Sequence, residues 1–358
     1  MSRRQLAIRL TAAAIGLVLA LVTGELALRV FLATPGPVFA IFRNPSLYAD
    51  YRSDDAWWKL YLALGGVHQP PATPHPLLGW VHDLDPVTYR HPDEDKRGDR
   101  RPVLLFGDSF ADCVDNTPCF EDFLNADPEF SRDHYLLNYG IGGYGLDQIY
   151  LLMQQVVGRY DHPVVVFSFM LEDIDRCLLR FRGGQKPVFE LEQGKLRLDN
   201  VPIDPHPTEW LARHPIGIPS YLFEFLRRAP RRVFGRLVGH PWIEESRTEE
   251  KKRLGAAVFQ EAVAELRRRN VTFTVLVFHP FTGRSWRDAL VLDLCAEVAV
   301  PCRGTDAIVG EREGLEGDAL FAPAIRRKYM LKDLDHPNAL QNRVIADYIK
   351  AFALRARR

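Results

Sequence analysis

The stretch VLLFGDSFAD, residues 103–112, joins an apolar run to a turn that carries a hydroxyl group. The run VLLF is uninterrupted, which is typical of a strand covered on both faces. Gly107, Asp108 and Ser109 end the run. All three are common turn residues, so one interpretation is a strand that leads into a solvated turn. The other is a nucleophile, Ser109, held at the edge of a sheet.

Four more apolar runs rich in β-branched residues follow this one, and the segments between several of them have helical spacing. Alternation of buried strands and helices predicts an α/β protein, a three-layer flavodoxin-like fold with a parallel sheet of about five strands and right-handed crossovers. The predicted strands are PVLLFG at 102–107, YLLNYGI at 135–141, PVVVFSFM at 163–170, VTFTVLVFH at 271–279 and EVAVPC at 297–302.

The N-terminal segment has the layout of a membrane-targeting sequence. Arg3, Arg4 and Arg9 precede an uncharged stretch at 10–24. That stretch spans about 22 Å as a helix, less than the roughly 30 Å of hydrocarbon in a bilayer, so a cleaved signal peptide is one alternative. The apolar pattern continues without a helix breaker to Pro35. It therefore favours an uncleaved signal-anchor over 1–34, a single-pass transmembrane helix with the rest of the chain outside the cytoplasm.

The remaining sequence divides into an extension and one large domain. Residues 35–100 are rich in proline and aromatic residues, and the prolines of HQPPATPHPLLGWVHD at 68–83 indicate irregular coil. We expect this extension to pack on a domain at 101–358. The strand and helix rhythm is interrupted at about 178–250 by an insertion, which includes a hairpin predicted at 186–200. Insertions in such folds often lie beside the site as lids.

Composition excludes some classes of function. Of 358 residues, 47% are hydrophobic, which is sufficient for a sizeable core, and Lys plus Arg equals Asp plus Glu at 46 each. The formal net charge is zero, so no overall electrostatic field attracts nucleic acid, and we predict no nucleic-acid partner. Among the five cysteines, Cys113 is close to Cys119 and Cys295 to Cys302, leaving Cys177 over. Disulfides between these neighbours and buried free thiols remain alternatives.

Polar clusters follow the predicted strands at the points where parallel sheets bind ligands. They are Ser109, the loop NYGIGGYG at 138–145, LEDIDR at 171–176, and KDLDHPN at 332–338 before the last helix. Acyl transfer needs a nucleophile, a base, a group that orients the base, and donors for an oxyanion. Ser109, His336 and Asp333 could supply the first three, and the N–H groups of Ser109 and Gly143 the last.

GDSF, NYGIGGYGLDQ and DLDH, in this order, resemble the motifs of the SGNH (GDSL) hydrolase superfamily. The similarity covers roughly residues 100–355, and the N-terminal helix with ELALR resembles the membrane-anchored bacterial branch. The resemblance implies a serine esterase or acyltransferase without a cofactor. It makes Ser109 the nucleophile, Gly143 an oxyanion donor, and Asp333 and His336 the other catalytic residues.

The third block departs from the family pattern, because MLEDIDR stands where Gly-x-Asn-Asp is usual and its Asn donates to the oxyanion. Asp173 or Glu172 takes that place, and an ionised carboxylate offers no donor. Either a buried acid such as Asp173 stays protonated, or Ser109 and Gly143 donate alone. Loss of one donor typically costs about 100- to 1000-fold in rate.

Asp108, Glu172 and His279 are further candidates for lining a substrate pocket. Each candidate also has a structural alternative: Ser109 as a helix cap, Gly143 as a turn glycine with positive φ, and an acidic turn at 172–173 that pairs with Arg176. Asp335 competes with Asp333 as the partner of His336. The spacing of the cysteines and acids predicts no metal site.

Three hypotheses of function follow. The first is an esterase anchored in the inner membrane with its soluble domain on the periplasmic side, acting on an ester such as the O-acetyl groups of an envelope glycan. The second uses the same acyl-enzyme for O-acyl transfer to an exported polysaccharide. The third is a catalytically inactive module that binds a glycan or a partner, which the acidic third block favours.

Overall fold

The computed structural model describes residues 2–66, 73–114, 117–237, 247–332 and 335–356, and gives side chains for all of these except 230–237. Internal contacts divide the chain into two units. The first unit comprises residues 1–69, 181–184 and 206–246, and the second comprises 70–180, 185–205 and 247–358.

A five-stranded parallel sheet forms the centre of the second unit. Its order is β4-β3-β5-β8-β9. β3, which comes first in the chain, lies between β4 and β5, and β8 and β9 follow on the side of β5. This order is that of a flavodoxin-like fold, so the predicted fold class is confirmed. The strands are β3 (Arg101–Gly107), β4 (His134–Gly140), β5 (Val164–Met170), β8 (Thr272–Phe278) and β9 (Cys302–Gly304).

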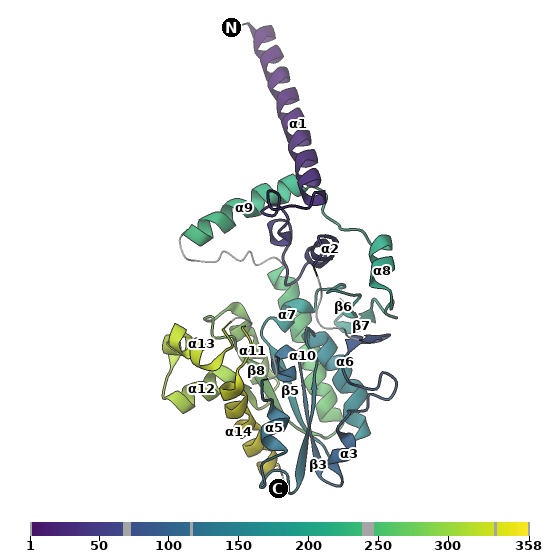
Figure 1. Ribbon diagram of the computed structural model, residues 1–358, viewed down its shortest axis with the longest axis vertical. Coiled ribbons are helices and arrows are strands. Elements are labelled where there is room, and N and C mark those ends of the chain that lie inside the picture. Colours follow the sequence, from purple (N-terminus) through teal and green to yellow (C-terminus); the bar gives the residue numbers. More distant parts are fainter. Residues whose placement is uncertain (1, 67–72, 115–116, 238–246, 333–334, 357–358) are drawn as a thin grey trace. The chain divides into compact units, whose positions relative to one another are not determined.

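Helices cover both faces of this sheet, as Figure 1 shows. Leu104 and Phe106 of β3 face one core with α6, α10 and α11, whereas Val103 and Leu105 face a second core with α5, α12 and α14. Alternate residues of one strand are therefore buried on opposite faces, which explains the uninterrupted apolar run. The helices of this unit are α3 (Glu94–Arg97), α4 (Ser109–Asp112), α5 (Phe120–Leu124), α6 (Leu146–Val156), α7 (Asp173–Arg176), α10 (Thr248–Arg268), α11 (Trp286–Glu297), α12 (Thr305–Glu313), α13 (Pro323–Tyr329) and α14 (Ala339–Arg355), with 3-10 turns at Val157–Arg159 and Gly317–Phe321.

The last strand lies later in the chain than the sequence predicted. The segment 297–302 was expected to form it, but α11 continues to Glu297 and β9 begins only at Cys302. Val298 and Val300 pack against the core from the loop between the two elements. Their apolar character reflects this packing and is not a strand signal.

Two antiparallel hairpins accompany the sheet. β6 (Val188–Glu192) and β7 (Lys195–Asp199) form the predicted hairpin, with positive φ at both Gln193 and Gly194, as a two-residue turn of type I′ requires. β1 (Thr73–His75) and β2 (Gly79–Val81) form a second one. It lies in the segment expected to be irregular coil, so that prediction was wrong for the described part, residues 73–83.

Both cysteine pairs that are close in sequence form disulfides, Cys113–Cys119 and Cys295–Cys302. Cys177 is a free thiol in the core and is fully buried. The first disulfide joins the residue after α4 to the residue before α5. It therefore closes the loop that follows Ser109.

The first unit is built around the C-terminal part of a long helix, α1 (Arg3–Ala33). Leu32 of α1 is buried in a cluster with Tyr48 and Leu60, and Leu28 is also buried. In contrast, the most apolar 18-residue window of α1 has a mean hydropathy of 2.2 and no buried residue. Among the described residues, α1 alone is long and apolar enough to cross a membrane. The unit also contains a 3-10 turn at Pro45–Leu47, α2 (Asp55–Ala63), α8 (Pro207–Arg213) and α9 (Tyr221–Leu237).

The two units cut across the predicted extension and insertion. Residues 35–69 of the extension belong with 206–246 of the insertion, and residues 73–100 belong with the sheet. The hairpin β6–β7 of the insertion also lies in the sheet unit. The boundaries at 34, 100 and 178–250, and the role of the insertion as a lid, stay predictions.

Candidate active site

Strand β3 delivers Ser109 to the carboxyl edge of the sheet through a tight turn. Gly107 ends the strand, and a Cβ there would lie 2.5 Å from both the Ala111 Cβ and the Ser168 Oγ, so only glycine fits. Asp108 then caps α4, its carboxylate accepting the N–H of Phe110 at 2.9 Å. Ser109 is the first residue of that helix, half-buried, with its side chain clear of the turn.

The hydroxyl of Ser109 meets the imidazole of His336. Ser109 Oγ lies 2.9 Å from His336 Nε2, although 227 positions separate the two residues. His336 comes from the loop before α14, where Leu331 N–H donates to its carbonyl at 2.7 Å. Its ring packs against Phe110, with 5.0 Å between ring centroids. This geometry allows the imidazole to take the proton of the hydroxyl.

The acid predicted to orient the imidazole, Asp333, lies outside the described residues. Asp335, its competitor in the sequence, is described and pairs with Arg326. It has an exposed side chain and a positive φ of 53°. Because Asp335 is engaged by Arg326, it is not the residue that we retain for orienting His336, and Asp333 stays a prediction.

A glycine-rich loop after β4 lies beside the nucleophile. A Cβ on Gly142 would lie 3.9 Å from the Ser109 Cβ, and Gly143 has a φ of +85°, a conformation that favours glycine. Trp80 holds this loop, since its indole N–H donates to Gly142 O at 3.1 Å. The turn role of Gly143 is thus met, and its role as an oxyanion donor stays a proposal.

Asn138 links the same strand to the helix of the nucleophile. Its side-chain amide donates to Ala111 O at 2.7 Å and to a Glu121 carboxylate oxygen at 3.0 Å, and its oxygen accepts the N–H of Gly140 at 2.9 Å. The motif signalled this residue only by its spacing from Gly143. The structure shows that Asn138 joins α4, α5 and the end of β4.

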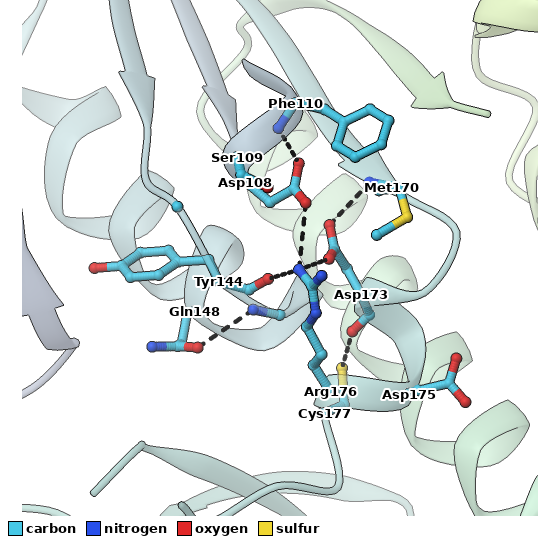
Figure 2. Close-up of polar contacts among 12 residues, drawn as sticks. Asp108, Ser109, Phe110, Tyr144, Gln148, Met170, Asp173, Asp175, Arg176 and Cys177 are labelled. Atoms are coloured by element: carbon cyan, nitrogen blue, oxygen red, sulfur yellow. Dashed lines mark hydrogen bonds and ion pairs between the residues drawn. The ribbon is translucent and has the colours of Figure 1, made fainter. Parts of the chain in front are cut away.

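The third block is organised by Arg176 and not by an amide. Figure 2 shows its guanidinium between Asp108, Asp173 and Tyr144. A single nitrogen, Nη1, lies 3.2 Å from an Asp108 carboxylate oxygen and 2.8 Å from Tyr144 O, and it also bonds to Asp173. Burial opposes the charge of Arg176, but Asp173 and Asp108 outweigh it and raise its pKa. Arg176 thus joins the nucleophile turn, the glycine loop and the third block.

Asp173 is not placed to donate to an oxyanion. Its side chain is 0% exposed, one carboxylate oxygen accepts the N–H of Met170 at 2.8 Å, and the other is paired with Arg176. Both carboxylate oxygens already accept hydrogen bonds, so neither is placed to donate one to an oxyanion. The sequence alternative, an acidic turn paired with Arg176, describes this contact better, except that the pair is buried and not solvated.

The three residues predicted to line a substrate pocket have different environments. Asp108 is 0% exposed and engaged by Phe110 N–H and Arg176, so it supports the turn and does not face a pocket. Glu172 is half-buried directly before α7. His279 is 2% exposed and lines a cavity of about 140 Å³ with Leu171, Arg284 and Asp306, whose described lining includes neither Ser109 nor His336.

Replacing Arg176 with methionine should strongly destabilise the sheet unit. The change leaves the buried carboxylates of Asp108 and Asp173 without their shared cation, which typically costs about 3–5 kcal/mol. Arg176→Lys should recover part of the loss, because one nitrogen makes all three contacts. Denaturant unfolding of the full chain in detergent measures this, and a Met variant within 1 kcal/mol of wild type would refute the clamp.

Asp112, the last residue of α4, introduces a pH dependence beside the site. Burial raises the pKa of Asp112 to about 6 from an ordinary 3.8, and repulsion from Asp108 adds to the rise. The N–H of Gly142, which donates to the carboxylate, opposes it. Because the native pKa exceeds the unfolded one, the stability cost of ionising Asp112 is absent below about pH 4. It grows between pH 4 and 6 and is complete above.

Asp112→Asn should therefore raise the free energy of unfolding at pH 7.5 by up to about 3 kcal/mol, the equivalent of the pKa shift, and leave it unchanged near pH 4. Thermal or denaturant unfolding at the two pH values measures the difference. Asp161→Asn, at an exposed acid, is the control and should show no such trend. Equal effects of Asp112→Asn at both pH values would contradict burial as the cause.

Comparisons with known proteins were made for the whole chain. No family model matches it, and no curated protein does. Its fold is similar to a protein assigned to the lipolytic G-D-S-L family from Desulfitobacterium hafniense, with 8% identity, 71% of this chain and 99% of that chain covered, and a TM-score of 0.36. The resemblance to the SGNH (GDSL) superfamily therefore rests on the motifs of this chain.

Two further solved structures are similar over a comparable share of the chain. A member of the lipolytic G-D-S-L family from Veillonella parvula has 10% identity, coverage of 71% and 97%, and a TM-score of 0.34. An alpha/beta hydrolase enzyme from the metagenome of Lake Arreo has 16% identity, coverage of 70% and 94%, and a TM-score of 0.33. The chemistry proposed next is argued from the residues of this chain.

Proposed function

We propose that this chain is a serine esterase of the SGNH type, anchored in the inner membrane by α1. The observation that supports it most directly is the 2.9 Å contact between Ser109 Oγ and His336 Nε2 at the carboxyl edge of the sheet. A serine hydroxyl is a weak nucleophile unless an adjacent base takes its proton. The contact pairs a hydroxyl with such a base.

In the proposed reaction, Ser109 Oγ bonds to the carbonyl carbon of an ester as its proton passes to His336 Nε2. The developing oxyanion would accept hydrogen bonds from the N–H of Ser109 and the N–H of Gly143. Within the described residues, the Ser109 N–H donates no hydrogen bond, which supports this role. The tetrahedral intermediate then expels the alcohol, to which His336 returns the proton. Water, deprotonated by His336, hydrolyses the acyl-enzyme.

The third block bears on the rate that this site can reach. Because Asp173 is engaged by Arg176, only two backbone donors remain in the proposal. Two donors are compatible with acyl transfer, at a rate about 100- to 1000-fold below that of a three-donor site. We therefore propose that Arg176 acts as a positioning residue, which holds Asp108 beside the nucleophile and Tyr144 beside Gly143.

The proposed orientation places the part of the chain that follows α1 outside the cytoplasm. Arg3, Arg4 and Arg9 precede the apolar part of α1, and positive residues stay on the cytoplasmic side. Substrates would then be esters at the outer side of the inner membrane, such as acylated carbohydrates of the envelope. Transfer of the acyl group to a sugar hydroxyl instead of water uses the same acyl-enzyme.

Labelling with a fluorophosphonate probe tests the proposal. We expect the full chain in detergent to react covalently and to hydrolyse p-nitrophenyl acetate, with the phosphonate found by mass spectrometry on the peptide that contains Ser109. Turnover that increases on adding a sugar acceptor would indicate transfer. A folded chain that neither reacts nor hydrolyses the ester would favour the inactive binding module and overturn the enzyme.

A further inference from the structure

The N-terminus of α9 is attached to α1 by one carboxylate. Glu25 of α1 accepts the hydroxyl of Ser220 at 2.9 Å, and it also accepts the backbone N–H of Leu222 at 2.8 Å and of Tyr221 at 3.2 Å. The side chain of Leu222 packs against Gly24, where a Cβ would lie 3.1 Å away. Figure 1 shows α9 beginning beside the lower end of α1 and extending away from it to the left. The first turn of α9 is therefore fixed at the level of Glu25.

This attachment sets the depth of α9 if α1 spans a bilayer. Arg9 and Glu25 bound the uncharged segment of α1, and the 16 residues of rise between them amount to about 24 Å. The hydrocarbon core is about 30 Å thick and the headgroup regions bring the bilayer to about 40–45 Å. With Arg9 at the cytoplasmic boundary of the hydrocarbon, Glu25 lies about 6 Å short of the opposite boundary, about one helical turn. The first turn of α9 then lies close to the level where hydrocarbon meets headgroups.

The exposed face of α9 is apolar. Phe223 and Leu226, three positions apart, are 62% and 56% exposed. The opposite side of the helix packs on the first unit, where the Phe225 ring lies 5.8 Å from that of Phe42. In the sequence, the helical spacing continues the apolar pattern at Val233, Phe234 and Leu237. Large exposed apolar side chains such as Phe223 and Leu226 mark an interaction surface.

The other part of α9 is strongly basic. The 17 residues of Tyr221–Leu237 include five arginines and one glutamate. Arg227 and Arg228 pair with that glutamate, Glu224, which leaves a net charge of about four positive units on the helix. An apolar stripe with Phe and Leu on an arginine-rich helix is the pattern of helices that lie in the plane of an anionic membrane surface.

We propose that α9 is an interfacial helix that docks on an anionic bilayer. Phe223 and Leu226 enter the acyl region, and the net positive charge of the helix attracts anionic lipid headgroups. The inference rests on the membrane anchor of the proposed function but not on the esterase chemistry. It gives the membrane, and not a protein, as the occupant of the exposed apolar face, because the carboxylate of Glu25 fixes that face at the boundary of the span.

Spin labels in the full chain, reconstituted in nanodiscs, test the proposal. The sites are Leu226→Cys on α9, Thr208→Cys on the exposed polar surface of α8, and Val18→Cys in the apolar part of α1. The wild-type chain, with its cysteines in disulfides or buried, gives the background. Accessibility to oxygen, which concentrates in lipid, is compared with accessibility to a water-soluble nickel complex, in discs of phosphatidylglycerol and of phosphatidylcholine.

In anionic discs we expect the ratio of oxygen to nickel accessibility at Leu226 to exceed that at Thr208 several-fold, and to decrease in neutral discs. A Leu226 label as wet as the Thr208 label would overturn the interfacial helix, as would a label shielded from both reagents, which indicates a protein partner. The Val18 label reports on the anchor separately, and p-nitrophenyl acetate hydrolysis in the same discs reports on the esterase. A lipid-exposed Val18 with a wet Leu226 would reject α9 docking alone.

Discussion

Ser109→Ala is expected to lower kcat for p-nitrophenyl acetate by about a thousandfold or more, and to abolish fluorophosphonate labelling. The change removes only the hydroxyl that contacts His336 at 2.9 Å. Without it, no acyl-enzyme forms, and the residual rate is that of general solvent attack in a site that still binds the ester. Losses of 10³- to 10⁶-fold are typical when the nucleophile of a serine hydrolase is removed.

Ester hydrolysis by the two chains, normalised to folded protein, measures this effect. Ser131→Ala, a change of the same size at the opposite end of the sheet, serves as the control and should retain wild-type activity. Retention of more than a tenth of the wild-type kcat by Ser109→Ala would remove Ser109 from the reaction. Unfolding curves of both variants exclude a loss caused by misfolding.

His336→Gln is expected to cost nearly as much as the loss of Ser109, about 10²- to 10⁴-fold in kcat with little change in KM. Glutamine keeps a polar side chain of similar reach but cannot accept the proton of the hydroxyl. The packing against Phe110 should be largely retained, so stability should change little. Steady-state kinetics on p-nitrophenyl acetate provides both constants.

A double-variant cycle sharpens this prediction. If Ser109 and His336 act as one unit, the chain with both changes should be about as active as either single variant. If the two losses multiplied instead, the double variant would be slower than either single variant by the full effect of the second change. That result would contradict a direct proton transfer between the two side chains. Because 227 positions separate the two residues in the chain, they are not coupled through a shared local segment.

The sequence was most informative where apolar runs and motifs are local. The run at 103–106 predicted a strand buried on both faces, and β3 is that strand. In the structure Ser109 Oγ lies 2.9 Å from His336 Nε2, and the catalytic roles that the motifs assign to the two residues stay predictions. The hairpin at Gln193 and Gly194 was also predicted, since two consecutive residues with positive φ have a clear sequence signal.

Contacts between distant segments were not predictable in the same way. Arg176 was recognised only as a neighbour of an acidic turn, whereas it clamps Asp108 and Tyr144, 68 and 32 positions away. Local spacing carries no information on which carboxylate a long cation will reach. Likewise, Val298 and Val300 are apolar as strand residues are, but they pack against the core from a loop. Their apolar character reflects this burial and not a place in a strand.

The pocket residues illustrate a similar limit. Asp108 and Asp173 lie at strand ends, where the sequence places ligand contacts, yet both are 0% exposed. Their position in the chain was predicted correctly, but the direction of their side chains depends on Arg176 behind them. The sequence therefore indicated which edge of the sheet carries the candidate site, but it did not indicate that these two acids are buried around Arg176.

Rapid-quench mass spectrometry of the acyl-enzyme tests the central claim most directly. The full chain is mixed with p-nitrophenyl acetate, quenched in acid within the first turnovers, and digested. We predict an acetyl group on the peptide that contains Ser109 in wild type, and none in Ser109→Ala. Steady hydrolysis with no acetyl group on Ser109, or with the acetyl group on another residue, would contradict the account.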